Sequence, residues 1–277
     1  MPDLRPNPTL RLEYRADQPI HHAFLEQAGR CPDATAILAR HSSCSYAQLA
    51  QISQGIAAYL VENAASGTDR VVIVDSRSAA LVYAMLGCLR AGLAFTVADA
   101  AYPPARIGQI IRTLAPAVVL RCGEAPLDVS GPIVVTVPEA PAEALQAFPW
   151  QQVALPIVNP EQPAYITFTS GSTGEPKGIV THHAPLVHFI DWHVRQHGFT
   201  QADTFSLLSG LGHDPVYRDV FTPLSIGATI ACPAQPTLTD PSQLAAWIQQ
   251  HGVSVIHLTP PLGKLIETGA HMNGQVL

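Results

Sequence analysis

The hydrophobic positions of this chain follow two different spacings in alternation. Residues 46–61 and 78–91 repeat apolar side chains three and four positions apart, which predicts helices. Short β-branched or aromatic runs such as 71–75 and 93–98 are typical of buried strands. The predicted helices are 46–61, 78–91, 104–114, 185–197 and 241–250, and the predicted strands are 71–75, 93–98, 117–120, 132–137, 164–169, 204–210, 228–232 and 254–258.

Alternation of strands and helices favours an α/β fold with mostly parallel sheets flanked by helices. Ser45 is a candidate cap for the first predicted helix, and Gly92 a candidate stop for the second. A proline- and alanine-rich segment at 138–161 interrupts the alternation. We interpret it as the connection between two packed sub-lobes, approximately 15–155 and 156–277.

Composition excludes several classes of function for the 277 residues. Apolar residues make up 47% and charged residues 13%, which is enough apolar material for a buried core. A net charge of −6 argues against nucleic acid as a partner. No apolar run is long enough to cross a membrane, and no secretory signal is visible. Five dispersed cysteines fit a reduced, cytoplasmic setting.

Twelve histidines raise the possibility of a metal site. His193 and His197 are one helical turn apart, but no recognisable metal-binding motif accompanies them. We therefore expect scattered solvated or core histidines and no protein-bound metal centre.

The segment TSGSTGEPKG at 169–178 is the most informative part of the chain. Its glycines let the backbone approach a ligand closely, and its hydroxyls and lysine offer donors to an anion. It is not a Walker A loop, because Pro176 stands where the second glycine belongs. The segment indicates a phosphate-holding loop, with a flexible surface turn as the alternative.

Together with the preceding AYITF, this loop closely resembles the signature of adenylate-forming enzymes, in particular amino-acid adenylation domains of nonribosomal peptide synthetases. Further motifs resemble the same family in the same order. They are CSYAQL at 44–49, LRAGLAFTVADAAYPPARI at 89–107 and GIVTHHAPLV at 178–187. The segments at 205–230 and 253–265 are similar to the aminoadipate-reductase branch. One departure is V-A-D-A at 97–100, where P-I-D-P is usual.

The resemblance implies a reaction and its cofactors. An ATP-dependent ligase would activate an amino-acid carboxylate as an aminoacyl-adenylate, with Mg²⁺, and pass it to a phosphopantetheine thiol on a carrier protein. The carrier would belong to the same chain or to a partner chain. Lys177 and Thr173 would be the catalytic residues. The loop over the β- and γ-phosphates would consist of Thr169, Ser170, Gly171, Ser172, Thr173, Gly174 and Lys177.

Three further residues are implied in substrate binding. Asp214 matches the position whose carboxylate holds the substrate α-amino group; the alternative is a helix N-cap. Arg218 would receive an acidic substrate side chain, and the alternative is a surface ion pair with Asp214 or Asp219. His213 would line the pocket.

Some of the family's features are missing from the chain. We find no Y-G-P-T-E-like motif, no T-G-D motif and no small C-terminal domain with its catalytic lysine. We therefore expect the N-terminal part of an adenylation domain that is inactive by itself. A stand-alone domain that binds a nucleotide or a partner without catalysis is the alternative. A fragment of an acyl or aryl acid ligase is a third reading, against which Asp214 argues.

Overall fold

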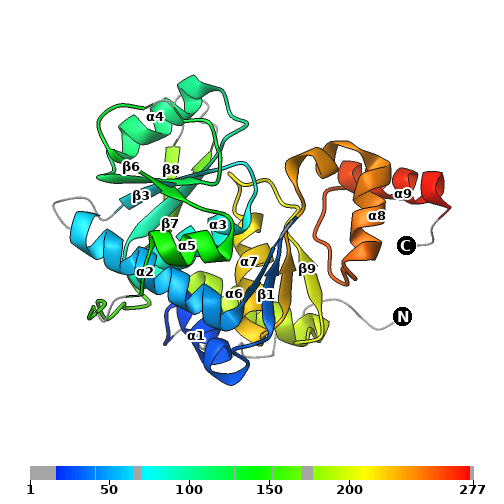
Figure 1. Ribbon diagram of the computed structural model, residues 1–277, viewed down its shortest axis with the longest axis horizontal. Coiled ribbons are helices and arrows are strands. Elements are labelled where there is room, and N and C mark those ends of the chain that lie inside the picture. The colour runs from blue at the N-terminus through cyan, green and yellow to red at the C-terminus, as the bar shows by residue number, and fades with distance from the viewer. Residues whose placement is uncertain are drawn as a thin grey trace, which may run out of the picture.

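The computed structural model describes residues 17–40, 42–64, 70–127, 129–150, 153–169 and 177–274. Within them the chain forms two β-sheets surrounded by helices (Figure 1). The larger sheet has six strands in the order β6-β5-β3-β4-β7-β8, all parallel to their neighbours except the edge strand β8. Its strands are β3 (Arg70–Asp75), β4 (Ala94–Asp99), β5 (Val118–Cys122), β6 (Ile133–Val137), β7 (Pro163–Thr169) and β8 (Lys177–His182).

The smaller sheet combines two strands from the beginning of the described chain with two strands from its later part. Its order is β2-β1-β10-β9, in which β1, β10 and β9 are parallel and β2 is antiparallel. The strands are β1 (Thr35–Leu38), β2 (Ser43–Ser45), β9 (Thr204–Ser206) and β10 (Thr229–Ala231). Neither sheet is confined to one side of residues 155–156, where the sequence placed the boundary between sub-lobes. The fold is the predicted α/β class, with two sheets of mostly parallel strands.

Helices cover both faces of the larger sheet. The helix α4 packs Ile107, Ile110 and Leu114 against Val72 and its neighbours on the outer face. On the inner face α3 is buried along nearly its whole length and lies within the main core, which both sheets share. The helices are α1 (Ile20–Arg30), α2 (Tyr46–Ala64), α3 (Ala79–Arg90), α4 (Pro104–Leu114), α5 (Pro141–Ala147), α6 (His183–His197), α7 (Pro215–Ile226), α8 (Pro241–Gln250) and α9 (Pro260–Asn273), with a 3₁₀ helix at Gln235–Thr239.

Local signals predicted several helix ends correctly. The Ser45 hydroxyl accepts from the Gln48 amide at 3.2 Å, and the Gln48 side chain accepts from the Ser45 amide at 2.9 Å. This reciprocal capping box begins α2. Gly92 follows α3 with φ of +71°, the left-handed conformation that ends many helices.

Three predicted segments differ in the structure. The strand predicted at 204–210 ends at Ser206, because the following carbonyls leave the sheet and accept hydrogen bonds from Arg77. Residues 254–258 do not form a strand and make only an isolated bridge between Phe205 and Val255. The connection at 138–161 contains the short helix α5, which begins at Pro141.

The cysteines act as core residues rather than cross-links. All five are free thiols, and four of them are buried. Burial raises the pKa of Cys44 to about 12, so this thiol stays protonated and unreactive. None of the described helices is long and apolar enough to cross a bilayer.

Candidate functional site

The β7–β8 hairpin places the glycine-rich loop at an edge of the larger sheet. Thr169 at the end of β7 pairs with Lys177 at the start of β8, and the Thr169 hydroxyl donates to the Lys177 carbonyl at 3.5 Å. Both residues are exposed. The other predicted loop residues, Ser170, Gly171, Ser172, Thr173 and Gly174, lie outside the described residues. Because β7 is parallel to β4, the loop leaves from the carboxyl ends of parallel strands, where α/β folds usually bind ligands.

A cavity of about 450 Å³ lies beside this hairpin. That volume is in the usual range for a small-molecule site. The cavity brings Thr169 together with two residues that follow it by more than 40 positions, His213 and Asp214. The remaining lining residues are Arg106, Tyr165, Thr167, Phe168, Ile179 and Thr181.

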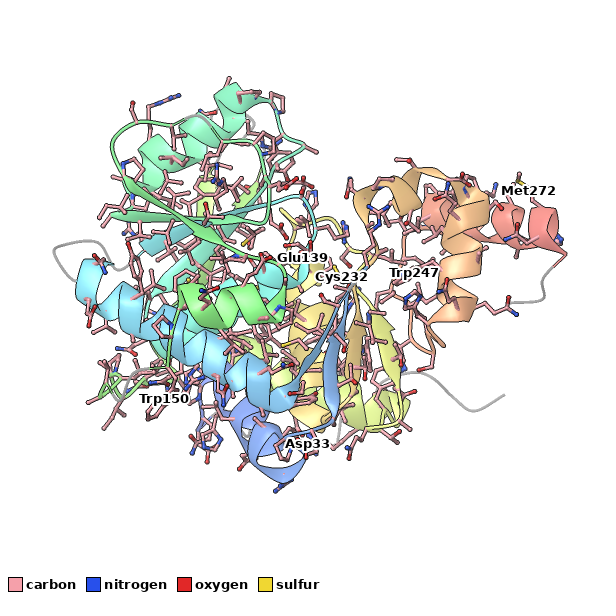
Figure 2. All side chains as sticks on the ribbon, viewed as in Figure 1. Asp33, Glu139, Trp150, Cys232, Trp247 and Met272 are labelled. Atoms are coloured by element: carbon pink, nitrogen blue, oxygen red, sulfur yellow. The ribbon has the colours of Figure 1, made fainter. Side chains whose placement is uncertain are left out.

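A larger hollow of about 750 Å³ lies elsewhere, at the carboxyl ends of β3, β5 and β10. Its lining residues include Arg77. They also include Glu139 and Cys232, whose labels lie next to each other in Figure 2. None of the predicted site residues that the structure describes lines it, whereas Thr169, His213 and Asp214 line the smaller cavity.

Asp214 occupies the N-cap position of α7 without capping it. Its backbone is already helical, with φ of −55° and ψ of −30°, and its side chain accepts no capping hydrogen bond. Asp214 lines the cavity together with Tyr165. Burial raises the pKa of Tyr165, the Thr181 hydroxyl lowers it, and the Asp214 charge raises it again. The carboxylate is therefore directed to the cavity rather than used in the helix end.

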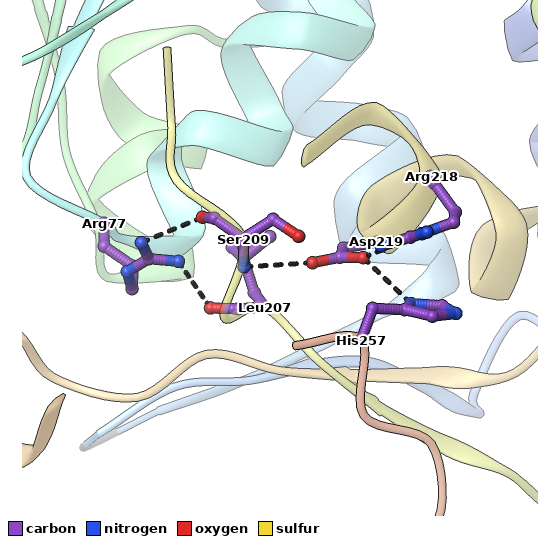
Figure 3. A network of polar contacts seen from close by, with 6 residues as sticks. All are labelled: Arg77, Leu207, Ser209, Arg218, Asp219 and His257. Atoms are coloured by element: carbon purple, nitrogen blue, oxygen red, sulfur yellow. Dashed lines mark hydrogen bonds and ion pairs between the residues drawn. The ribbon is translucent and has the colours of Figure 1, made fainter. Parts of the chain in front are cut away.

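Arg218 does not line the cavity. It is one turn further along α7, where its Nε lies 3.5 Å from the Asp219 carboxylate (Figure 3). Among the described residues Arg218 pairs with Asp219 and not with Asp214. Asp219 is fully buried, so this pair is not on the surface.

Sequence reasoning did not predict the contacts that three charged or titratable residues make in this region; it named Asp219 only as a possible surface partner of Arg218. Arg106 adds a guanidinium to the cavity and stacks over the Tyr102 ring at 4.2 Å. Asp219 and His257 form a 3.0 Å contact across 38 positions. Arg106 lies within the second family motif, which is a signal that was available; no local pattern links Asp219 to His257.

Three of the histidines form a cluster of ring contacts, one tilted and one T-shaped. His193 lies 5.1 Å from the His257 ring and 4.9 Å from the His197 ring, measured between centroids. Burial, together with the charges of His257 and His197, lowers the pKa of His193 to about 4. No group of three or more metal-binding side chains occurs among the described residues.

Comparison with known proteins identifies the family to which the chain belongs. A model of AMP-binding enzymes matches residues 24–275, nearly the whole chain. The chain belongs to the AMP-binding enzyme family. This finding confirms the resemblance to adenylate-forming enzymes seen in the motifs.

Several members of this adenylate-forming family are similar along most of the chain. An L-2-aminoadipate reductase of Schizosaccharomyces pombe is 31% identical, over 96% of this chain and 21% of the reductase. Phenyloxazoline synthase MbtB of Mycolicibacterium paratuberculosis is 34% identical, over 90% of this chain and 21% of the synthase. A crystal structure of the nonribosomal peptide synthetase FmoA3 superposes with a TM-score of 0.83 at 29% identity, covering 92% of this chain and 27% of that one. The chain thus spans about a fifth of the length of these curated relatives.

Proposed function

We propose that this protein activates an amino acid with ATP. The amino-acid carboxylate attacks the α-phosphorus, a new P–O bond forms, and the bond to the bridging oxygen breaks to release pyrophosphate. The phosphopantetheine thiol of a carrier protein then attacks the aminoacyl carbonyl, a thioester forms, and AMP leaves. The observation that carries the proposal is the cavity that joins Asp214 to the stem of the phosphate loop at Thr169.

The cavity carries opposite charges suited to a zwitterion bound beside a nucleotide. The Asp214 carboxylate would pair with the substrate ammonium, because a charge-assisted contact is the strongest that a single side chain offers. His213 would line the pocket next to it. Arg106 supplies a cation in the same cavity for a carboxylate or phosphate oxygen.

The loop would hold the β- and γ-phosphates of ATP. Lys177 and Thr173 would serve as the catalytic charge and hydroxyl, and Ser170 and Ser172 as further donors, with the loop glycines admitting close backbone approach. A structure of FmoA3 with AMPPNP belongs to a protein similar to this chain, which supports ATP as the nucleotide.

Mg²⁺ fits this donor set as an ion held mainly by the phosphates. The loop hydroxyls are hard oxygen donors of the kind that Mg²⁺ accepts, and the described residues offer no cluster that would bind the ion by itself. When bound, Mg²⁺ would neutralise phosphate charge during the transfer.

An amino acid with an acidic side chain is the substrate that Arg218 favours. Arg218 is partly exposed, one turn beyond Asp214 on α7, and its guanidinium is the nearest cation on that helix. Similarity to proteins named as L-2-aminoadipate reductases supports the same class of substrate. Arg218→Met should therefore weaken the use of acidic amino acids more than that of neutral ones.

Amino-acid-dependent ATP–pyrophosphate exchange tests the proposal. It would be measured on the 277-residue chain and on the full open reading frame, with acidic, neutral and amine-free acids. Exchange that requires an amino acid supports the proposal. Stimulation by acids without an amine would favour an acyl or aryl acid ligase, and binding of nucleotide without any exchange would favour a non-catalytic domain.

A further inference from the structure

The segment that leads to Asp214 is held at one residue from two sides (Figure 3). The Ser209 carbonyl accepts from Arg77 at 2.9 Å, and the Ser209 amide donates to the Asp219 carboxylate at 3.1 Å. Arg77 also donates to the Leu207 carbonyl at 2.6 Å. Ser209 is therefore a fixed point just after β9.

The hold from one side comes from the larger sheet. Arg77 follows β3 and has φ of +79°, a left-handed conformation that costs free energy for a residue with a side chain. Burial lowers the pKa of its guanidinium, so its desolvation also carries a cost. The two hydrogen bonds from Arg77 to backbone carbonyls therefore have to offset both the strained backbone and the desolvation. The segment also passes close to Tyr102, because a Cβ on Gly212 would be 2.0 Å from the Tyr102 hydroxyl oxygen.

The hold from the other side comes from α7. The Asp219 carboxylate is fully buried, and each of its oxygens has a partner, the Ser209 amide for one and His257 Nδ1 for the other. Arg218 Nε lies 3.5 Å from the oxygen that His257 contacts. A buried carboxylate with this set of donors is a rigid anchor rather than a mobile surface group.

We propose that Arg77 and Asp219 are positioning residues for the cavity, acting through Ser209 on His213 and Asp214. The Ser209–Asp219 bond closes a loop of ten positions, and both cavity residues lie within it. Asp214 makes no capping bond of its own, so the ends of this loop determine where its carboxylate lies. The proposal rests on the proposed role of Asp214 in amine binding.

Hydrogen exchange of the backbone amides in the 277-residue chain tests the positioning directly. In Asp219→Asn and Arg77→Lys, amides at 209–214 should exchange about tenfold faster or more. Asparagine accepts from the Ser209 amide without the carboxylate charge, and a lysine ammonium lacks the planar fork that reaches both carbonyls. Amides of α3 should keep their rates. Unchanged exchange at 209–214 would overturn the proposal.

Two matched controls make the same chemical changes away from this loop. Asp240→Asn alters a carboxylate that accepts from the Ser242 and Gln243 amides at the start of α8. Arg90→Lys alters a partly buried guanidinium that donates to the Ala50 carbonyl and the Ser53 hydroxyl. Neither should speed exchange at 209–214. If Asp219→Asn fails to fold, Arg77→Lys decides the test by itself.

Kinetics then separates positioning from general stability. Asp219→Asn should raise the KM for the amino acid about tenfold and leave the KM for ATP unchanged. Combined with Asp214→Ala, its effect should largely disappear, since both changes remove the same contact. Full additivity would contradict action through Asp214. These kinetics use the wild-type and variant forms of the full open reading frame. If its wild-type form shows no amino-acid-dependent exchange, the proposed function is refuted, whereas the amide-exchange result still decides the positioning role.

Discussion

Asp214 is exposed and faces an open cavity, although aspartate is a favoured N-cap residue and stands at the start of α7. The amides of Val216 and Tyr217, which an N-cap side chain would accept from, already donate to the His213 and Asp214 carbonyls. The helix therefore loses little when the Asp214 side chain does not cap it. The buried histidines, in contrast, are neutral residues of the core. They destabilise the folded protein only when they are protonated.

We expect Asp214→Asn to raise the KM for the amino acid about tenfold or more, because an amide cannot pair with an ammonium charge as a carboxylate does. The KM for ATP should stay the same. Exchange kinetics with each substrate varied in turn provides the measurement. Asp203→Asn is the control, since Asp203 is a half-buried aspartate that accepts from Thr200 and Ser254 outside the cavity. Equal changes in both KM values would contradict the assignment.

We expect the protein to lose stability as the pH falls from about 6.5 toward 4. Burial lowers the pKa of His183 to about 4, so the unfolded chain binds a proton in this interval that the folded chain does not. The free energy of unfolding therefore decreases with falling pH, by about 2 kcal/mol or more at pH 4 for this residue.

His183→Asn should remove part of this pH dependence. The asparagine oxygen can replace His183 Nδ1 as acceptor for the Ile20 amide, now 3.2 Å away, but does not titrate. Urea unfolding at pH 7 and pH 4.5 gives the comparison. An identical loss of stability in both proteins would rule out His183 as a source.

At the scale of elements, close packing of helices requires glycine at particular places. Gly55 on α2 lies against the backbone after α5, where an added Cβ would be 2.1 Å from the Phe148 carbonyl oxygen. Gly29 on α1 has no neighbouring atom within 4 Å of such a Cβ. The same residue type thus has opposite roles on two helices.

We expect Gly55→Ala to destabilise the protein by about 1–3 kcal/mol, because the carbonyl cannot move without displacing the chain. Gly29→Ala should instead stabilise it by about 0.5–1 kcal/mol, through the better helix propensity of alanine. Chemical denaturation measures both. A loss in both variants would show that α1 is as tightly packed as α2.

At the scale of the whole molecule, one core holds both sheets together. This main core includes Ile37 and Ile230 of the smaller sheet and Ile73 and Phe95 of the larger one. The pair α8 and α9 lies to one side and packs around a separate cluster that includes Trp247 (Figure 1). We therefore expect two levels of stability in the molecule.

Hydrogen exchange should show that α8 and α9 open at a lower free energy than α3 and the strands around it. Gly269→Ala supplies a selective perturbation, because its Cβ would be 1.8 Å from the Pro241 carbonyl oxygen between these helices. This variant should accelerate exchange in α8 and α9 only. Equal acceleration in α3 would mean that the molecule opens as one unit.

Periodicity and capping chemistry predicted most of the longer helices and the central strands, because those signals act within a few residues. The short strands β1 and β2 and the helices α1 and α9 gave no comparable signal. The predicted strand at 254–258 has the right composition for a sheet, yet it makes a single bridge because its partner β9 ends at Ser206.

The sequence by itself determined the α/β class, the glycine-rich loop and the family, because each depends on residue order within a short segment. Only the tertiary structure decided that Arg106 shares a cavity with Asp214 and that Arg218 pairs with a buried Asp219. It also decided that Arg77 donates a hydrogen bond to the Ser209 carbonyl, 132 positions away. These contacts depend on how the two sheets pack against each other. The spacing of residues along the sequence does not predict that packing, because each sheet combines strands from distant parts of the chain.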